Sequence, residues 1–532
     1  MREIRQWFHS RPVLAVGLAV AAVIATGVGA RAAFDNLLLV GALHTPQAEH
    51  LEQSDLIALV RDNQSEAAFE AAFEHGDELF ETVFNALDGV GANVGANQRF
   101  TRLPRADLAG AGEWAQHTPS RTTGPNAQAC RTCHLEPTDD GAGPIAANVV
   151  RDPEHSGVLG RFIQRNTPHV FALGALQRLA EEMSDDLAAI RDAIVLAACA
   201  SSNGTTRSAT LLSKGVAFGT LRARQVSRGS VCPNAPRRRF ALDLSGVRGV
   251  DADLVVKPFQ WKGSVAFLRD FSRGAGHNEL GMQAVELVGD GVDGDFDGVV
   301  NELSIGDLTA LSIYIAAQPR PLTTPELAAL GLLALTPAEQ SAITSGAARF
   351  HDAACDTCHQ PALELRDALF SEPSQQPSFR DAAFPDGQDP VARAIDPALP
   401  VTFDLTRDLP DNRIEIDGEI VALGNHPSNG RGGAVIALYG DLKRHDMGSR
   451  LAEPINDEGI GAALFLTENL WGVGSTAPYM HDGRATTLTE AILAHGGEAT
   501  AARNAFTALP TSSQADLIAF LDSLVLFKAP EE

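Results

Sequence analysis

Two five-residue motifs constrain this chain more than any other feature: Cys130-Arg131-Thr132-Cys133-His134 and Cys355-Asp356-Thr357-Cys358-His359. Each has the C-x-x-C-H pattern at which a c-type haem is attached. The two thiols can bond to both vinyl groups of one porphyrin, and the adjacent His supplies an axial nitrogen to the iron. Zinc, one alternative, typically needs two such pairs brought together and does not require the following His. A dithiol redox pair is the other alternative. The motifs therefore predict two covalently bound haems, with His134 and His359 as proximal ligands.

The N-terminus predicts export from the cytoplasm. Arg2, Arg5 and Arg11 precede an apolar run at 12–29, which small residues at positions 30 and 32 follow. This order is typical of a secretory signal peptide, here residues 1–32. The apolar run also approaches the length that spans a bilayer, so an uncleaved anchor is the alternative. We expect a periplasmic protein, because covalent haem attachment belongs to the same compartment.

Two cysteines lie outside the haem motifs, Cys199 and Cys232. In an oxidising compartment they are expected to form a disulfide, and two unpaired buried thiols are the alternative. The chain carries 42 Lys and Arg against 67 Asp and Glu, a net charge of −25. No basic patch indicates nucleic-acid binding, and we interpret the three arginines at 237–239 as solvated surface.

Length and periodicity predict a mainly α fold with two c-type cytochrome domains, each carrying one haem, and with loop-rich and short β insertions. A chain of 532 residues exceeds one ordinary domain. The expected order is a lead-in segment at 33–64, an N-terminal haem c domain at 65–320 and a C-terminal haem c domain at 321–532, with a Pro-rich linker at 318–321. Apolar periodicity predicts helices over about 69–84, 166–200, 265–273, 305–317, 337–350 and 513–527, and an extended region at 205–250.

The two halves also share a Gly-x-x-x-Phe pattern upstream of each haem motif. Gly76 and Phe80 form it in the first half, and Gly346 and Phe350 form it in the second. Two haem-bearing units of one ancestry are the simple interpretation.

The sixth ligand of each iron decides the chemistry, because an open position binds peroxide or oxygen and a filled one mainly transfers electrons. For the first haem the candidates are His155, His169 and, with less support, Met282. For the second haem they lie within residues 477–488 and at His495. Each lone His has a structural alternative, since most such residues are hydrogen-bonded parts of a core.

Four stretches carry a family resemblance: Arg165-Asn166-Thr167-Pro168 with Val170-Phe171, Leu442 to Gly448, Leu470 to Gly474, and Ala477 to Leu488 with its A-P-Y-x-H-D-G pattern. Together they resemble the bacterial di-haem cytochrome c peroxidase superfamily, and within it the di-haem oxidoreductase branch. The resemblance covers about residues 65–527.

The resemblance implies that electrons enter at the C-terminal haem and that peroxide reacts at the N-terminal haem. Trp261 matches a Trp between the two haems, and an ordinary core aromatic is its alternative role. The family's distal ligand falls fourteen residues after the His of the H-D-G motif, which leads from His481 to His495 in place of Met. His481 and Arg484 are then expected to hold a haem propionate.

The family also places a Gln and then a Glu over the peroxide-binding iron, and the Glu moves a proton between the peroxide oxygens. The matching positions here are Phe271 and Gly281, which departs from the pattern. Glu279 is the first choice for the acid–base, with His277 and Glu286 as alternatives.

Asp293, Asp295 and Asp297, followed by Gly298, match the first half of a calcium-binding loop. The twelfth position is Ser304 where an acid is expected, so Glu302 or Asp307 would complete the site. An acidic surface turn is the alternative.

These observations predict a periplasmic di-haem oxidoreductase that reduces or uses hydrogen peroxide. We expect a small cytochrome or cupredoxin as electron donor. A homodimer is one possible assembly of the chain. One alternative is an electron-transfer protein in which both irons have six ligands. Another is haem-dependent oxidation of an organic or protein substrate, as in the related rubber oxygenases and the methylamine dehydrogenase maturation enzyme.

Overall fold

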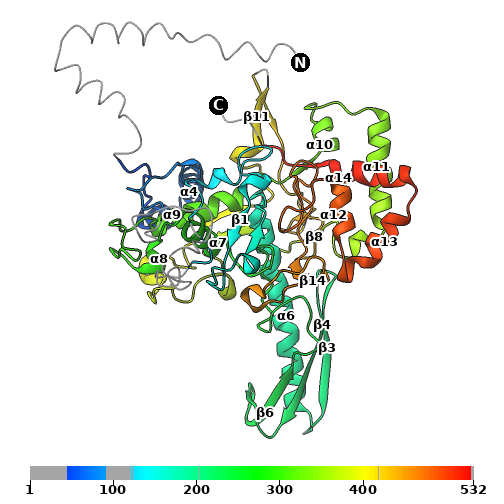
Figure 1. Cartoon of the computed structure of the whole chain (residues 1–532). Coiled ribbons are helices and arrows are strands. Elements are labelled where there is room, and N and C mark those ends of the chain that lie inside the picture. The colour runs from blue at the N-terminus through cyan, green and yellow to red at the C-terminus, as the bar shows by residue number, and fades with distance from the viewer. Residues whose placement is uncertain (1–44, 92–120, 124, 203, 417, 529–532) are drawn as a thin grey trace, which may run out of the picture.

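The computed structural model describes residues 45–91, 121–123, 125–202, 204–416 and 418–528. The predicted signal peptide and the start of the lead-in segment lie outside these residues. The helices are α3 (Gln53–Arg61), α4 (Ser65–Glu81), α6 (Leu173–Ala200), α7 (Leu268–Ala275), α8 (Val285–Val288), α9 (Ile305–Ala317), α10 (Thr324–Ala329), α11 (Pro337–Asp352), α12 (Leu488–Ala494), α13 (Thr500–Ala508) and α14 (Thr511–Asp522) (Figure 1).

Short strands accompany the helices. They are β1 (Val149–Arg151), β2 (Ile163–Arg165), β3 (Thr206–Ser213), β4 (Val216–Val226), β5 (Ser230–Cys232), β6 (Ala235–Asp243), β7 (Leu322–Thr323), β8 (Leu363–Glu364), β9 (Leu369–Glu372), β10 (Val401–Asp404), β11 (Arg413–Ile416), β12 (Glu419–Ala422), β13 (Val435–Ile436), β14 (Arg444–Asp446), β15 (Leu464–Leu466) and β16 (Leu524–Val525). In the described chain they form six two-stranded sheets and one four-stranded sheet of order β3-β4-β6-β5. Helices with small β insertions are therefore confirmed.

The Gly-x-x-x-Phe pattern marks one helix crossing in each half. A Cβ on Gly76 of α4 would lie 2.3 Å from the Ala310 carbonyl oxygen of α9, and one on Gly346 of α11 would lie 1.9 Å from the Asp516 carbonyl oxygen of α14. Only a residue without a side chain permits such close approach of two backbones. The Phe one turn later then contacts a haem-motif histidine: the ring centroids of Phe80 and His134 are 5.7 Å apart, and those of Phe350 and His359 are 6.4 Å apart. Both haem motifs therefore share a Gly at a close helix crossing and a Phe that contacts the motif histidine.

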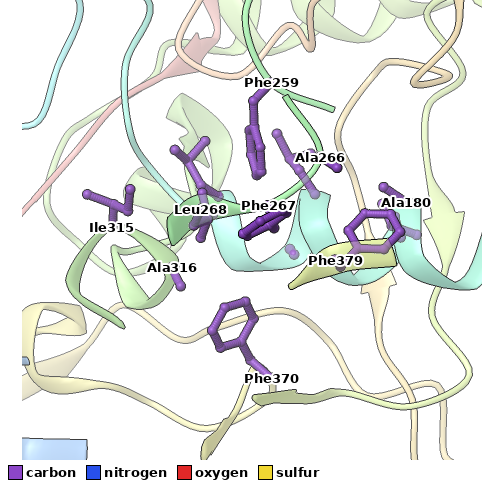
Figure 2. Close-up of a cluster of buried hydrophobic side chains, with 14 of the residues drawn as sticks. Ala180, Phe259, Ala266, Phe267, Leu268, Ile315, Ala316, Phe370 and Phe379 are labelled. Carbon is purple, nitrogen blue, oxygen red and sulfur yellow. The ribbon is translucent and has the colours of Figure 1, made fainter. Parts of the chain in front are cut away.

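The largest hydrophobic core crosses the predicted boundary near residue 320. Figure 2 shows Phe370 and Phe379, from the second half, packed with Phe267, Leu268 and Ile315 from the first. A separate, smaller core joins α11, α12, α13 and α14 around the second haem motif. The stretch expected to be a linker is buried, with Gln318 only 2% exposed. The segment around residues 363–442 therefore packs with the first half, and the domain limits stay predictions.

The second half of α6 and the four-stranded sheet project from the body as an arm (Figure 1). The inner face of the sheet packs on α6 through residues such as Leu221 and Ala223. Near the end of α6 a disulfide joins Cys199 to Cys232 of β5, which confirms the predicted pairing. This disulfide links the helix of the arm covalently to its sheet.

Substituting Cys199 with Ser is expected to destabilise this arm. The bridge closes a loop of 33 residues, and removing such a constraint from the unfolded chain costs about 2–4 kcal/mol. Hydrogen exchange of the β5 and β6 amides is the measurement, because the loss should appear there before it appears around the haem motifs. Unchanged protection of these amides would contradict the prediction.

In the described part of the chain, no helix combines the length and the apolar character that crossing a membrane requires.

Candidate functional site

The second haem motif follows directly on α11. A capping box starts that helix: the Thr336 hydroxyl accepts from Glu339 N, and the Glu339 carboxylate accepts from Thr336 N at 2.8 Å. After α11 the chain forms a tight turn at Cys355–Thr357, and His359 Nδ1 lies 3.1 Å from the Tyr439 carbonyl oxygen. Because Nδ1 is held by the backbone, Nε2 of His359 is left for a metal.

His359 lines a cavity of about 430 Å³ whose walls are mainly apolar. Cys355 and Cys358 also face it and form no disulfide. An apolar cavity with two thiols and an imidazole on its wall fits a covalently held porphyrin. Burial lowers the pKa of His359 to about 4, so the ring is neutral as an iron ligand must be.

His495 lies across the same cavity from His359. It follows α12, and its Nδ1 lies 2.7 Å from the Ala491 carbonyl oxygen, so Nε2 is left free here too. The two ring centroids are 6.4 Å apart. At this separation one metal ion can bond to both rings, since metal–imidazole bonds are about 2.0–2.1 Å long. This geometry supports His495 as the sixth ligand of the second haem.

His481 and Arg484 are placed differently relative to this cavity. The His481 ring stacks on Phe465 with centroids 4.3 Å apart and lines the cavity. Burial, with the positive charges of Arg165, Arg484 and Lys262, lowers the pKa of His481 to about 4. Arg484 is half-exposed, pairs with Asp482 and donates to the Arg450 carbonyl oxygen at 2.7 Å. His481 is therefore neutral and Arg484 is neutralised by Asp482, and the expectation that they hold a propionate stays a prediction.

His445 is a site residue to which no sequence motif assigned a role. Its Nε2 lies 2.9 Å from Asp441 Oδ2, its Nδ1 lies 2.8 Å from Glu498 Oε2, and Cys358 Sγ is 4.0 Å away. Burial opposes a charge on this ring, but the Asp441 carboxylate and the Cys358 sulfur raise its pKa to about 10. An imidazolium thus adjoins the second haem motif. The residue lies in the quoted Leu442 to Gly448 motif, which carried no sign of its partners.

The first haem motif lies beside α4. Cys130–Thr132 form a tight turn, Cys130 and Cys133 form no disulfide, and the His134 ring packs against Phe80. Burial lowers the pKa of His134 to about 4 and raises the pKa of the Cys130 thiol to about 12. Among the described residues, a group of possible metal ligands occurs at the second haem motif, where Cys358, Asp441 and His445 lie close together, but not at the first.

Glu279 adjoins the first haem motif. It lies in a single π-helical turn, Gly276–Leu280, and its carbonyl oxygen accepts from Asn126 N and Ala127 N, three residues before Cys130. Its carboxylate accepts from Asn126 Nδ2 at 2.6 Å. Burial is the largest influence and raises the pKa of Glu279 to about 7, although Asn126 and Arg151 oppose this. A carboxyl with this pKa can both take and return a proton near neutral pH.

The departure at Gly281 has a steric reason. Its φ is +85°, and a Cβ there would lie 2.8 Å from Pro125 Cγ. A Glu at 281 has no room, whereas Glu279, at the π-turn, is partly accessible. Phe271, at the other departing position, packs on Phe259 and lines the cavity.

The two alternatives to Glu279 are placed differently. Glu286 is fully buried and forms ion pairs with Arg269 and Arg273. That placement gives Glu286 a structural role. His277 is buried in the same π-turn as Glu279, and its carbonyl oxygen accepts from Arg121 Nε at 3.1 Å.

The three candidate distal ligands of the first haem lie in different surroundings. His169 is buried, and its Nδ1 accepts from Phe171 N at 3.1 Å. The ring also bonds the Asn469 side chain and the Trp471 backbone, so it is engaged as a structural His. His155 lies in a turn after β1 with φ of +50°, and Met282 is fully buried in the large core.

Trp261 links the two halves. Its Nε1 donates to the Asn166 carbonyl oxygen at 2.8 Å, and Asn166 N donates to the His481 carbonyl oxygen at 2.8 Å. The cavity that holds His359 and His495 extends to Trp261 and on to Thr167, beside the first haem motif. Trp261 therefore lies in the region that connects the two halves, and its role as a bridging Trp stays a prediction.

Glu468 is a second site residue that no sequence motif indicated. It lines the cavity, and burial alone raises its pKa to about 7. No local pattern marks it, because its burial depends on the fold around it.

The three aspartates of the calcium-like loop do converge. Their carboxylates lie close enough to share one ion, and Asp295 is fully buried beside Arg121 at 3.4 Å. Burial, with the charges of Asp295 and Asp297, raises the pKa of Glu302 to about 9. Asp307 instead caps α9 and bonds His50 and His75. Glu302 is thus the better candidate to complete the site, and calcium binding stays a prediction.

Comparison with known proteins agrees with the resemblance. Residues 410–524 match a family model described as "Di-haem oxidoreductase, putative peroxidase". This stretch includes the H-D-G motif and His495, and it confirms the expected resemblance over its length. No curated protein matches the chain.

Among solved structures, six chains match. One is described as a "MauG-like protein associated with microbial copper homeostasis". It is 18% identical, the match covers 56% of this chain and 78% of that one, and the TM-score is 0.24.

Proposed function

We propose, from the di-haem oxidoreductase match of residues 410–524 and from the two C-x-x-C-H motifs, that this protein is a di-haem c-type oxidoreductase of the periplasm. It reduces or uses hydrogen peroxide in its N-terminal half with electrons that enter through its C-terminal half. A small cytochrome or cupredoxin is the proposed donor.

One observation carries this proposal: His359 and His495 face each other across an apolar cavity that continues to Trp261. A fully ligated iron at one site suits electron entry, and the other site is then left for the oxidant. Cys355, Cys358, His359 and His495 would hold the second haem, and Cys130, Cys133 and His134 the first. When bound, the haems supply the iron chemistry that exchanges electrons and reacts with peroxide.

The protein's own contribution to peroxide cleavage is proton transfer. Glu279 is the proposed acid–base, since Asn126 orients its carboxylate and burial raises its pKa to about 7. Such a group takes a proton from one peroxide oxygen and returns it to the other. The Trp261 indole is fixed by its bond to Asn166 and lies in the connecting region between the two halves.

Replacing His495 with Met is expected to raise the reduction potential of the second haem. Thioether sulfur favours reduced iron relative to imidazole, and axial ligands span roughly 0.8 V in proteins. Spectroelectrochemical titration of the purified protein measures the shift. His155→Met is the matched control, and it should leave that potential unchanged. An unaltered potential in the His495 variant would remove His495 from the axial role.

A half-reduced sample mixed with peroxide tests the function itself. Its absorption and electron paramagnetic resonance spectra report the haem count and the spin state of each iron. We expect one low-spin haem and one high-spin haem that reacts with peroxide. Two irons that stay low-spin and inert would leave electron carriage as the function instead.

A further inference from the structure

The projecting arm has a charge opposite to the rest of the chain. Residues 201–250, which hold β3 to β6 and are called the basic arm below, contain nine Lys and Arg and one Asp, a net charge of +8. The whole chain has a net charge of −25, so the remainder carries −33. The run at 237–239 is therefore part of a larger basic surface, which its short sequence did not reveal.

Strand register places three of these charges on the outer face of the sheet. Arg222 lies opposite Asp243, Arg224 opposite Ala241, and Val226 opposite Arg239. Residues paired in this way, and alternate residues along a strand, share one face. Arg222, Arg224 and Arg239 therefore lie on the face turned away from α6.

Most of these arginines lack an acidic partner. Arg222 is paired with Asp243 at 3.6 Å. Within the described residues no ion pair is formed by the others, which are Arg207, Arg224, Arg228, Arg237, Arg238, Arg239 and Arg248. Arg224, Arg228 and Arg237 are exposed. Like charges crowded on one face repel one another, so an acidic surface that covers the face would stabilise it.

Helix α4 offers the complementary surface. Glu66, Glu70, Glu74 and Glu78 recur every four residues and are all exposed, so they form one stripe along its solvent face. None of the four pairs with a cation among the described residues; the ion pair of this helix with Arg131 is made by Glu81. Figure 1 places α4 on the body and the basic arm on the projection, so the two surfaces are separate within one copy.

We propose that the basic arm of one copy docks on the α4 glutamate stripe of a second copy. The sequence supplies both surfaces, with a row of exposed arginines on one and a row of exposed glutamates on the other. Two copies that exchange this contact form a closed dimer with two identical interfaces. Attraction of this kind sets specificity and register, and salt screens it.

Sedimentation velocity of the haem-loaded protein tests the proposal at low and high sodium chloride. We expect dimers at low salt and monomers at high salt. Arg224→Glu with Arg237→Glu should weaken self-association about tenfold or more, and so should Glu70→Arg with Glu74→Arg. Mixing the two double variants should restore association, because each then offers the other a complementary surface.

Arg407→Glu with Arg431→Glu is the matched control. Both residues are exposed, lie outside the arm and change the net charge by as much as the double substitution of Arg224 and Arg237 does, so dimers should persist. Haem absorption and circular dichroism confirm that each variant folds. A wild-type protein that stays monomeric at low salt overturns the proposal. A monomer that binds anionic lipid vesicles through the basic arm overturns it too. Dimers that survive both double substitutions overturn it as well.

Discussion

Replacing Glu279 with Gln should lower the peroxide turnover number by about 10²–10⁴-fold, the contribution typical of a positioned acid–base. The substitution keeps the shape of the side chain and its contact with Asn126 but removes the group that carries the proton. Stopped-flow reduction of peroxide by the half-reduced protein is the measurement. Unchanged haem spectra would show that the loss does not come from a displaced iron.

The pH profile separates this role from a structural one. Burial raises the pKa of Glu279 to about 7, and the carboxylate is the form that accepts the first proton. Turnover in the parent protein should therefore rise as pH increases through about 7, and the Gln variant should lack this rise. Glu136→Gln, at an exposed position near the same motif, is the control and should retain both rate and profile. Equal rates in the parent and the Glu279 variant would mean that another residue transfers the proton.

Local signals predicted the parts of the fold that short segments determine. The expected helix at 305–317 coincides with α9, and Thr336 caps α11 as its sequence indicates. The fourteen-residue interval from His481 to His495 also places an imidazole opposite His359, because α12 and its flanking turns fix that distance. Such features depend on neighbours in the chain and on one family pattern.

The remaining features depend on contacts between distant residues. Gly281 excludes a side chain because Pro125 lies against it, and a single sequence does not show that neighbour. Arg222 and Arg239 share a face because β4 pairs with β6 in one register. The large core extends past residue 320 because Phe370 and Phe379 pack into it. In each case the deciding partner is far away in sequence.

Arg269→Ala should lower the free energy of unfolding by about 3–5 kcal/mol, the cost of leaving buried charges without a partner. Arg269 is 2% exposed, pairs with Glu286, and binds Glu372 at 3.1 Å and Thr309 Oγ1 at 2.8 Å. Urea unfolding followed by circular dichroism measures the change. Arg407→Ala, at an exposed site, should change stability by less than about 0.5 kcal/mol.

The free energy of unfolding lost in the Arg269→Ala variant should become smaller as pH falls. Burial raises the pKa of Glu372 to about 7 even with Arg269 present, and without the guanidinium it should rise further. A carboxyl whose folded pKa exceeds its unfolded value destabilises the fold fully above the folded pKa, and this cost declines as pH falls from the folded pKa toward the unfolded pKa. The variant should therefore recover stability relative to the parent as pH falls from about 8 to about 6. A loss that stays constant over this range would mean that packing of the Arg269 stem, and not charge, joins the two halves of the chain here.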